Sequence, residues 1–235
     1  MSWMIKKPSG IINITLKKGF LAPGLHLAVF LMFFSSFPVS VFGSGPASGL
    51  IPVGMPAELV KLQEKFEAGI LLQARLSHEF QDSYTGEIQR VEGWIWVYKD
   101  KYRIETEHQV LLIDGTISRV YNRQQNTLLI SDYDAEDDDF APSRFFNLAE
   151  ERYQVSDVQR DRDMVRVEIE ALDPFDVFTN VTIVIQKNLV PVEVFAVDQM
   201  QNSMRTIFKQ ASFHEYDASF FQYAFPDDAE IIDLR

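Results

Sequence analysis

From Ile88 almost to its C-terminus, the chain is a succession of short segments with strand character, joined by turns of a few residues. The connections include "KD", "EH", "DG" and "RDRD". They are too short for a crossover between parallel strands, which needs about a dozen residues or more. Consecutive strands are therefore predicted to be antiparallel neighbours. Together with two short helices, they predict a mainly β (α+β) fold built on one strongly curved sheet of about ten to eleven strands.

The first strand is expected over residues 71–80, where apolar side chains and His78 alternate with polar ones at period two. Further strands are expected at 88–98, 101–106, 109–113, 117–121, 127–133, 153–159, 165–172, 181–186, 191–197, 205–214 and 230–234. Gly, Asp, Asn and Lys bound most of these segments, as is typical of turns.

Two helices are expected. The first follows Pro56, a residue suited to the first helical position, and ends at Gly69. Its apolar stripe consists of Leu59, Leu62 and Phe66. The second is expected within residues 140–153, where Pro142 opens it. Its apolar cluster at helical spacing consists of Phe145, Phe146, Leu148 and Ala149.

The first 43 residues contain four lysines and no acidic residue, and they include an apolar run from Leu25 to Phe42. This composition predicts a cleaved signal peptide over residues 1–43. An uncleaved membrane anchor is the alternative, although Pro38 and the serines interrupt the run. Residues 44–56 are rich in Gly, Pro and Ser and predict a flexible leader. Residues 57–235 are predicted to form a single domain.

The composition excludes several classes of protein. The net charge of −12 argues against a nucleic-acid-binding protein, which needs a basic surface. The absence of cysteine excludes disulfides, thiol catalysis and zinc sites built on thiolates. It also excludes a lipid-modified cysteine as an anchor of this chain. A hydrophobic content of 46% is ample for a folded core.

The segment "GWIWVYKDKYRIE" is apolar on both faces of its predicted strands. Trp94, Trp96 and Tyr98 share one face, and Ile95 and Val97 share the other. One interpretation is a curved sheet that is too wide to be filled by its own side chains and so encloses a cavity for a hydrophobic ligand. The other interpretation is an ordinary filled core with exposed tryptophans.

Catalytic or metal-binding patterns are weak. There is no GxSxG motif, and His78 is interpreted as a core or rim histidine. The acidic run Asp132–Asp139 lacks the Gly and Glu that an EF-hand requires at its sixth and twelfth positions. It is interpreted as a solvated loop, with loose calcium binding left open. We therefore expect no enzyme activity, no cofactor and no resident metal.

Several segments follow one another in a distinctive order: a short helix, "GWIWVYKDKYRIE", "VLLIDGTISRVYN", an acidic loop, "APSRFFNL", "LDP" and "FFQYAFPDDAEII". No single motif is specific. Their order and spacing resemble the periplasmic outer-membrane lipoprotein carrier (LolA) family over about residues 56–234.

The resemblance implies an incomplete antiparallel barrel whose concave apolar face is covered by short helices as a lid. It implies a monomeric periplasmic carrier without covalent chemistry. Such a carrier accepts acylated lipoproteins from an inner-membrane ABC exporter and delivers them to an outer-membrane receptor or to the membrane.

The family pattern also implies site residues. The acyl-chain cavity would be lined by Ile95, Val97, Tyr102, Ile104, Val110 and Leu112. The lid would present Leu59, Leu62, Phe66, Phe145, Phe146 and Leu148.

One position departs from the family. Members often carry an Arg-Pro pair after the Gly-x-x-Trp-x strand, and the arginine bonds to lid carbonyls. This chain has Lys99 and Asp100 there, and lysine lacks the planar fork of arginine. A lid latch at Lys99 is therefore a hypothesis. Alternatives for the whole chain are another lipid- or lipoprotein-sensing module of this fold, a periplasmic hydrolase, or an envelope protein that binds a partner through Trp94 and Trp96.

Overall fold

The structure is a computed structural model that describes residues 54–135, 138, 141–142 and 152–235. The predicted signal peptide, most of the predicted leader and most of the predicted second helix lie outside these residues, and Tyr153 at the end of that predicted helix begins a strand. Among the residues described, no helix is both long enough and apolar enough to span a membrane.

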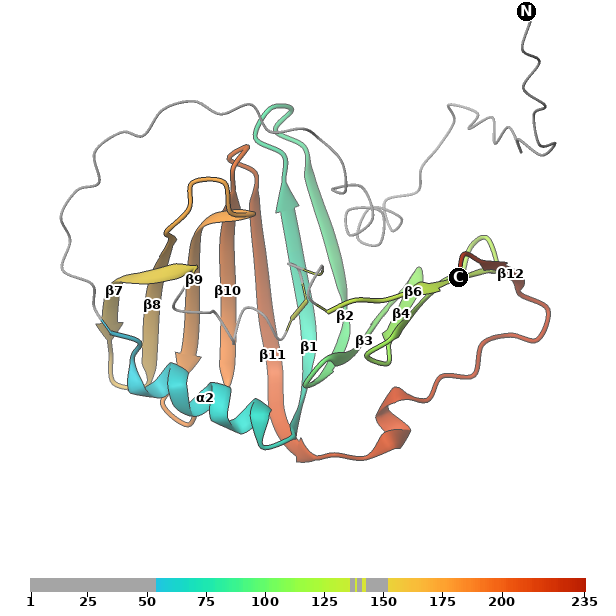
Figure 1. The fold of residues 1–235 in the computed structure, drawn as a ribbon, viewed down its shortest axis with the longest axis horizontal. Coiled ribbons are helices and arrows are strands. Elements are labelled where there is room, and N and C mark those ends of the chain that lie inside the picture. The colour runs from blue at the N-terminus through green and yellow to red at the C-terminus, as the bar shows by residue number, and fades with distance from the viewer. Residues whose placement is uncertain (1–53, 136–137, 139–140, 143–151) are drawn as a thin grey trace, which may run out of the picture.

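Twelve strands join into one sheet (Figure 1). The elements are α2 (Ala57–Glu67), β1 (Ile70–Gln81), β2 (Ile88–Tyr98), β3 (Lys101–Thr106), β4 (Gln109–Ile113), β5 (Ile117–Asn122), β6 (Thr127–Asp132), β7 (Tyr153–Arg160), β8 (Met164–Ala171), β9 (Phe178–Gln186), β10 (Pro191–Asp198), β11 (Ser203–Glu215), the 3-10 helix η2 (Ala218–Phe221) and β12 (Glu230–Asp233).

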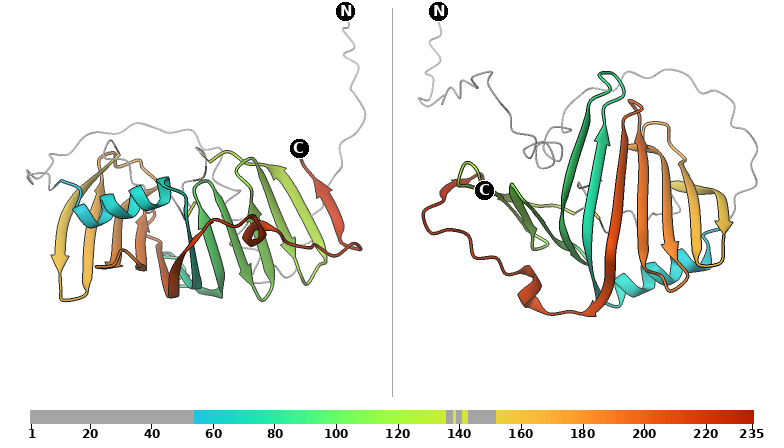
Figure 2. Two further views of the ribbon diagram at one scale, coloured as in Figure 1. Left: turned by 90° about the horizontal axis from the view of Figure 1, so that it is seen from below. Right: turned by 180° about the vertical axis from the view of Figure 1, so that it is seen from behind.

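The sheet is open. Its strand order is β12-β6-β5-β4-β3-β2-β1-β11-β10-β9-β8-β7, so β12 and β7 are its two edges (Figure 2). Consecutive strands from β1 to β6 and from β7 to β11 are antiparallel, as the short turns predicted. The predicted incomplete barrel with a helix on its apolar face is confirmed.

The last strand differs from its expected pairing. β12 pairs with β6 in parallel, with Ile231 opposite Leu128. A long return segment, 216–229, makes this possible because it carries the chain from the end of β11 to the far edge of the sheet (Figure 1). The antiparallel rule applies to strands joined by short turns, and this strand has no such connection.

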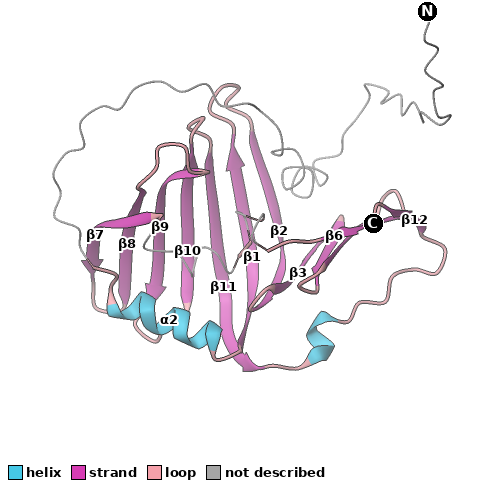
Figure 3. Ribbon diagram, viewed as in Figure 1, coloured by secondary structure: helices cyan, strands magenta, loops and turns pink. Residues whose placement is uncertain are grey.

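Helix α2 covers one end of strands β7 to β11 (Figure 3). It forms because Leu59, Leu62 and Phe66 make one apolar stripe, and all three side chains are buried. Phe66 meets Phe213 of β11 edge to face, with ring centroids 6.2 Å apart. The helix ends at Glu67, and Gly69 just beyond it has a φ of 80°, which few other residues adopt without strain.

The C-terminal segment covers the opposite face of the sheet. Tyr223 and Phe225 pack against each other with ring centroids 4.9 Å apart, and Phe225 meets Tyr121 of β5 at 6.0 Å. Val110 and Leu128 are buried in the same small cluster. The sheet is therefore apolar on both faces in this half, because Val110 and Tyr121 face the C-terminal segment while Leu111 and Val120 belong to the main core cluster.

Candidate functional site

The inner face of the sheet, meaning the face on which α2 packs, is a continuous apolar surface. The strand registers align apolar residues of neighbouring strands in rows across the sheet. In one row, Ile95 of β2 lies opposite Ile104 of β3, which in turn lies opposite Leu111 of β4. On the far side of β1, Ile183 of β9 lies opposite both Val167 and Val194. All of these side chains belong to one core cluster, which also contains the α2 stripe.

Four of the six predicted cavity residues lie on this inner face. Ile95, Val97, Tyr102 and Ile104 are buried in the core cluster that the α2 stripe completes. The structure thus brings together the residues predicted from β2 and β3. Whether they contact a ligand remains a prediction.

The other two predicted cavity residues require a correction. Val110 and Leu112 lie on the opposite face, because Ile104 pairs with Leu111 and the alternation continues from there. The inner face of β4 is formed instead by Leu111 and Ile113. All five residues of β4 are buried, so a pattern of apolar and polar residues could not reveal which of them face inward.

The predicted lid is described in part. Leu59, Leu62 and Phe66 lie on the underside of α2, as predicted. Phe145, Phe146 and Leu148 lie outside the described residues. A salt bridge of 3.0 Å between Glu58 and Arg160 of β7 adds a polar attachment for the helix.

Lys99 occupies the β2–β3 turn with a φ of 50°. Its ammonium lies 5.8 Å from the centroid of the Tyr98 ring. It donates no hydrogen bond to a carbonyl of α2 or of any other described residue. The latch remains a prediction, because half of the predicted lid lies outside that part of the chain.

A buried carboxylate lies at the edge of the inner face. Asp138 is only 8% exposed and accepts hydrogen bonds from the hydroxyls of Tyr102, at 2.7 Å, and Tyr133, at 2.9 Å. Burial and the negative charge of Asp138 raise the pKa of Tyr102 well above its ordinary value, so its hydroxyl stays a donor. This corrects the expectation of a fully solvated acidic loop. The described residues contain no group of three or more potential metal ligands.

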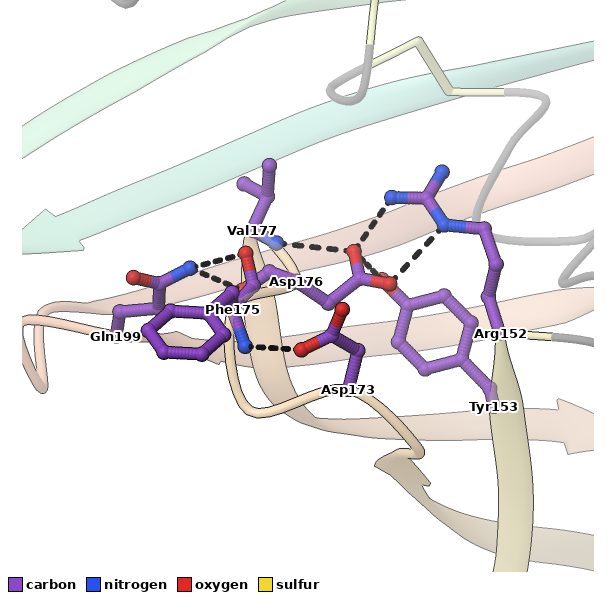
Figure 4. A network of polar contacts seen from close by, with 7 residues as sticks. All are labelled: Arg152, Tyr153, Asp173, Phe175, Asp176, Val177 and Gln199. Atoms are coloured by element: carbon purple, nitrogen blue, oxygen red, sulfur yellow. Dashed lines mark hydrogen bonds and ion pairs between the residues drawn. The ribbon is translucent and has the colours of Figure 1, made fainter. Parts of the chain in front are cut away.

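A second buried carboxylate shapes the turn between β8 and β9 (Figure 4). Asp176 accepts two hydrogen bonds from the Arg152 guanidinium, at 2.5 and 3.0 Å, and one from the Tyr153 hydroxyl at 3.0 Å. The backbone N–H of Val177 donates to the same carboxylate at 2.9 Å. This network joins the start of β7 to the start of β9 and was not predicted, because its members are 24 residues apart.

Two histidines bear on catalysis. His78 has its Nδ1 2.9 Å from the Thr206 hydroxyl, and burial lowers its pKa to about 4, so it is neutral near pH 7. It is the rim histidine that was expected. His214 has its Nε2 2.9 Å from the Ser212 hydroxyl. No carboxylate of the described residues is hydrogen-bonded to His214, so this pair lacks the third member that orients a catalytic histidine.

The stacked tryptophans lie on the outer face. Trp94 and Trp96 stack with ring centroids 6.2 Å apart, and the Arg103 guanidinium lies 4.7 Å from the Trp96 ring. Arg103 also donates to the carbonyls of Phe220 and Gln222 at 3.0 and 3.1 Å. The outer aromatic residues therefore serve largely to hold the C-terminal segment against the sheet.

Comparison with known proteins finds similarity at the level of the fold. No protein-family model and no curated protein sequence matches the chain. An uncharacterized conserved protein from Thermus thermophilus has a similar structure, with a TM-score of 0.50 and 14% identity over 75% of this chain and 97% of that chain. At this identity the similarity shows a shared fold and nothing further.

Two other solved structures have lower TM-scores. A LolA superfamily protein from Nitrosomonas europaea matches with a TM-score of 0.38 and 10% identity, over 71% of this chain and 96% of that chain. An outer membrane lipoprotein-sorting protein domain from Vibrio parahaemolyticus matches with a TM-score of 0.35 and 11% identity, over 69% of this chain and 95% of that chain. The open sheet with a helix on its inner face agrees with the incomplete, helix-covered barrel that the sequence resemblance implied.

Proposed function

We propose that the protein is a periplasmic carrier that binds the acyl chains of lipoproteins between its inner face and α2. The observation that supports this most is the continuous apolar surface across the sheet, on which α2 is the one helix packed in the described residues, with Met55, Tyr133 and Ala141 beside it in the same cluster. An acyl chain is long, flexible and apolar, so a broad face without directional polar groups suits it. Transport needs no covalent chemistry, and the incomplete Ser212–His214 pair gives no reason to invoke it.

Binding requires α2 to move, because its stripe and the inner-face residues beneath it are buried against each other. Exposing Leu59, Leu62 and Phe66 costs roughly 5–9 kcal/mol, at about 1.5–3 kcal/mol for each side chain. Burying an acyl chain of about 16 carbon atoms contributes roughly 12 kcal/mol, at about 0.8 kcal/mol per CH₂. One chain therefore offsets the displacement of the helix, and further chains add affinity.

The resemblance to the lipoprotein carriers supports the direction of transport. In this proposal the carrier is a monomer that receives its cargo from an inner-membrane ABC exporter and releases it to an outer-membrane receptor or to the membrane. The basic, apolar N-terminus then acts as the signal for export.

The test uses the salt bridge between α2 and β7. The chain has no cysteine, so Glu58→Cys with Arg160→Cys provides two unique thiols for a cleavable bismaleimide linker. Uptake is measured by displacement of a bound hydrophobic dye with a synthetic triacylated cysteinyl peptide, and the unacylated peptide is the ligand control.

We expect the linked protein to lose displacement and to regain it when the linker is cleaved. The same double variant without the linker is the protein control, and it should take up the acylated peptide normally. Equal displacement by both peptides, or full uptake by the linked protein, would contradict the proposed site.

A further inference from the structure

Three turns lie together at the end of the strands opposite α2 (Figure 1). They are the β1–β2 turn at 82–87, the β8–β9 turn at 172–177 and the β10–β11 turn at 199–202. The antiparallel order β2-β1-β11-β10-β9-β8 requires this arrangement, because each of these hairpins reverses at the same end of the sheet. We refer to them together as the three-turn end.

Hydrogen bonds join the three turns into one unit. The Ser83 hydroxyl donates to the carbonyl of Met200 at 2.6 Å, and its backbone N–H donates to the Asn202 side chain at 2.9 Å. Gln199 donates through Nε2 to the carbonyls of Phe175 and Asp176 (Figure 4). The relative positions of the turns are thus set by side-chain bonds to backbone carbonyls.

The side chains that protrude from the three-turn end are apolar. The exposed fraction is 96% for Tyr84, 51% for Leu172, 55% for Phe175 and 57% for Met200. These four large apolar side chains on adjacent turns form a surface in contact with water. Binding of a partner or a membrane would remove this surface from water and so be favourable.

The carboxylates of these turns act locally. Asp82 accepts hydrogen bonds from the backbone N–H groups of Tyr84 and Thr85, and Asp173 accepts one from that of Phe175. They hold the turns in the shape that presents Tyr84 and Phe175 to solvent. No lysine or arginine occurs in any of the three turns. Arg152, at the start of β7, offsets the charge of Asp176, and Asp82, Glu87 and Asp173 leave the surface negative.

We propose that the three-turn end is a docking surface for a lipid membrane with zwitterionic headgroups. Apolar side chains on protruding turns enter the soft interfacial region of a bilayer, whereas a protein partner would have to offer a matching pocket for each. Tyr84 suits that region because its ring is apolar and its hydroxyl can remain hydrated. The carboxylates disfavour anionic lipids, which peripheral proteins usually contact through Lys and Arg. This membrane contact goes beyond the proposed carriage of cargo and needs no cargo to occur.

The test uses the cargo-free protein without its first 43 residues. Met200→Cys introduces a single thiol for an environment-sensitive fluorophore, and Ile232→Cys on β12 is the matched control because it is exposed at an edge of the sheet. Labelled proteins are titrated with vesicles of phosphatidylcholine alone and of phosphatidylcholine with an equal amount of phosphatidylglycerol.

We expect a blue shift at position 200 and none at position 232, with affinity about tenfold lower for the anionic vesicles. Phe175→Ser combined with Tyr84→Ser should abolish the shift and leave acyl-peptide uptake unchanged. Ile231→Ser combined with Leu234→Ser, which likewise removes two exposed apolar side chains elsewhere on the surface, should leave vesicle binding unchanged.

Several results would overturn the proposal. One is the absence of any shift at position 200 with phosphatidylcholine vesicles; another is an equal shift at both positions. Tighter binding to the anionic vesicles would refute the role of the carboxylates. Salt-sensitive binding to a purified exporter's periplasmic domain, without vesicle binding, would assign the turns to a protein partner instead. Since uptake and vesicle binding are measured separately, this proposal can fail while the carrier function stands.

Discussion

Gly93 occupies a position in β2 where even one methyl group has no room. A Cβ atom built on Gly93 would lie 2.0 Å from the backbone oxygen of Glu105 and 3.2 Å from the Cα of Thr106. The φ angle of Gly93 is not in the left-handed region that favours glycine. The close approach of the Glu105 backbone is therefore the reason for a glycine at this position. Pairing between β2 and β3 begins at this residue, with Gly93 opposite Thr106. The glycine therefore lets the backbone of β3 approach β2 closely at this end of their ladder.

The expected cost of Gly93→Ala follows from this geometry. A carbon–oxygen contact needs about 3.4 Å, so β3 must move by roughly 1.4 Å at this point. Backbone atoms cannot rotate away as a side chain could. Overpacking of this kind costs about 1–3 kcal/mol, and losing one or two ladder hydrogen bonds adds about 1 kcal/mol each. We expect a loss of about 2–5 kcal/mol in the free energy of unfolding.

Urea denaturation followed by tryptophan fluorescence measures this loss, because Trp94 and Trp96 lie beside the substitution. Gly54→Ala is the matched control, since nothing lies within 4 Å of a Cβ atom there. Equal slopes and a lower midpoint for Gly93→Ala would support the argument. A difference of less than about 0.5 kcal/mol between the two variants would refute the role of close approach.

Three further predictions concern buried polar groups. Because burial lowers the pKa of His78 to about 4 in the folded state, the unfolded chain binds a proton more readily below about pH 6.5. The free energy of unfolding should therefore fall by up to roughly 3 kcal/mol as the pH drops from 6.5 to 4, and His78→Gln should flatten this dependence. Tyr102→Phe removes a donor to Asp138 and should cost about 1–3 kcal/mol in urea. Asp176→Asn removes the charge that faces Arg152 and should cost about 1–3 kcal/mol, with faster amide exchange at Val177.

Each of these predictions has its own contrary result. A pH dependence that is the same with His78 and with Gln at that position would show that another group carries it. Tyr84→Phe is the control for Tyr102→Phe, because its hydroxyl is exposed and should be dispensable. Unchanged exchange at Val177 after Asp176→Asn would mean that the carboxylate does not hold this turn.

Local sequence patterns were enough to predict helix α2, the strands and the antiparallel pairing of the strands that short turns join. Short turns between apolar segments required antiparallel neighbours, and the stripe of Leu59, Leu62 and Phe66 required a helix that packs on the sheet. Alternation along β2 placed Ile95 and Val97 on one face, and the family resemblance assigned that face, together with Ile104, to the cavity. These conclusions depend on contacts between residues close in sequence, where period and turn length leave few choices.

Contacts between segments that are distant in the sequence became visible only in the folded structure. The register of β4 turned Val110 and Leu112 outward, since a strand buried on both faces shows no alternation. The C-terminal segment explains why the outer face is aromatic, and nothing local predicts where that segment returns. The ion pair between Asp176 and Arg152 likewise forms only because the order of β7, β8 and β9 in the sheet brings the two residues together. For β4 and the outer face the physical reason is that burial by a distant segment leaves no periodic signal, and for Asp176 and Arg152 it is that a contact across the sheet depends on strand order.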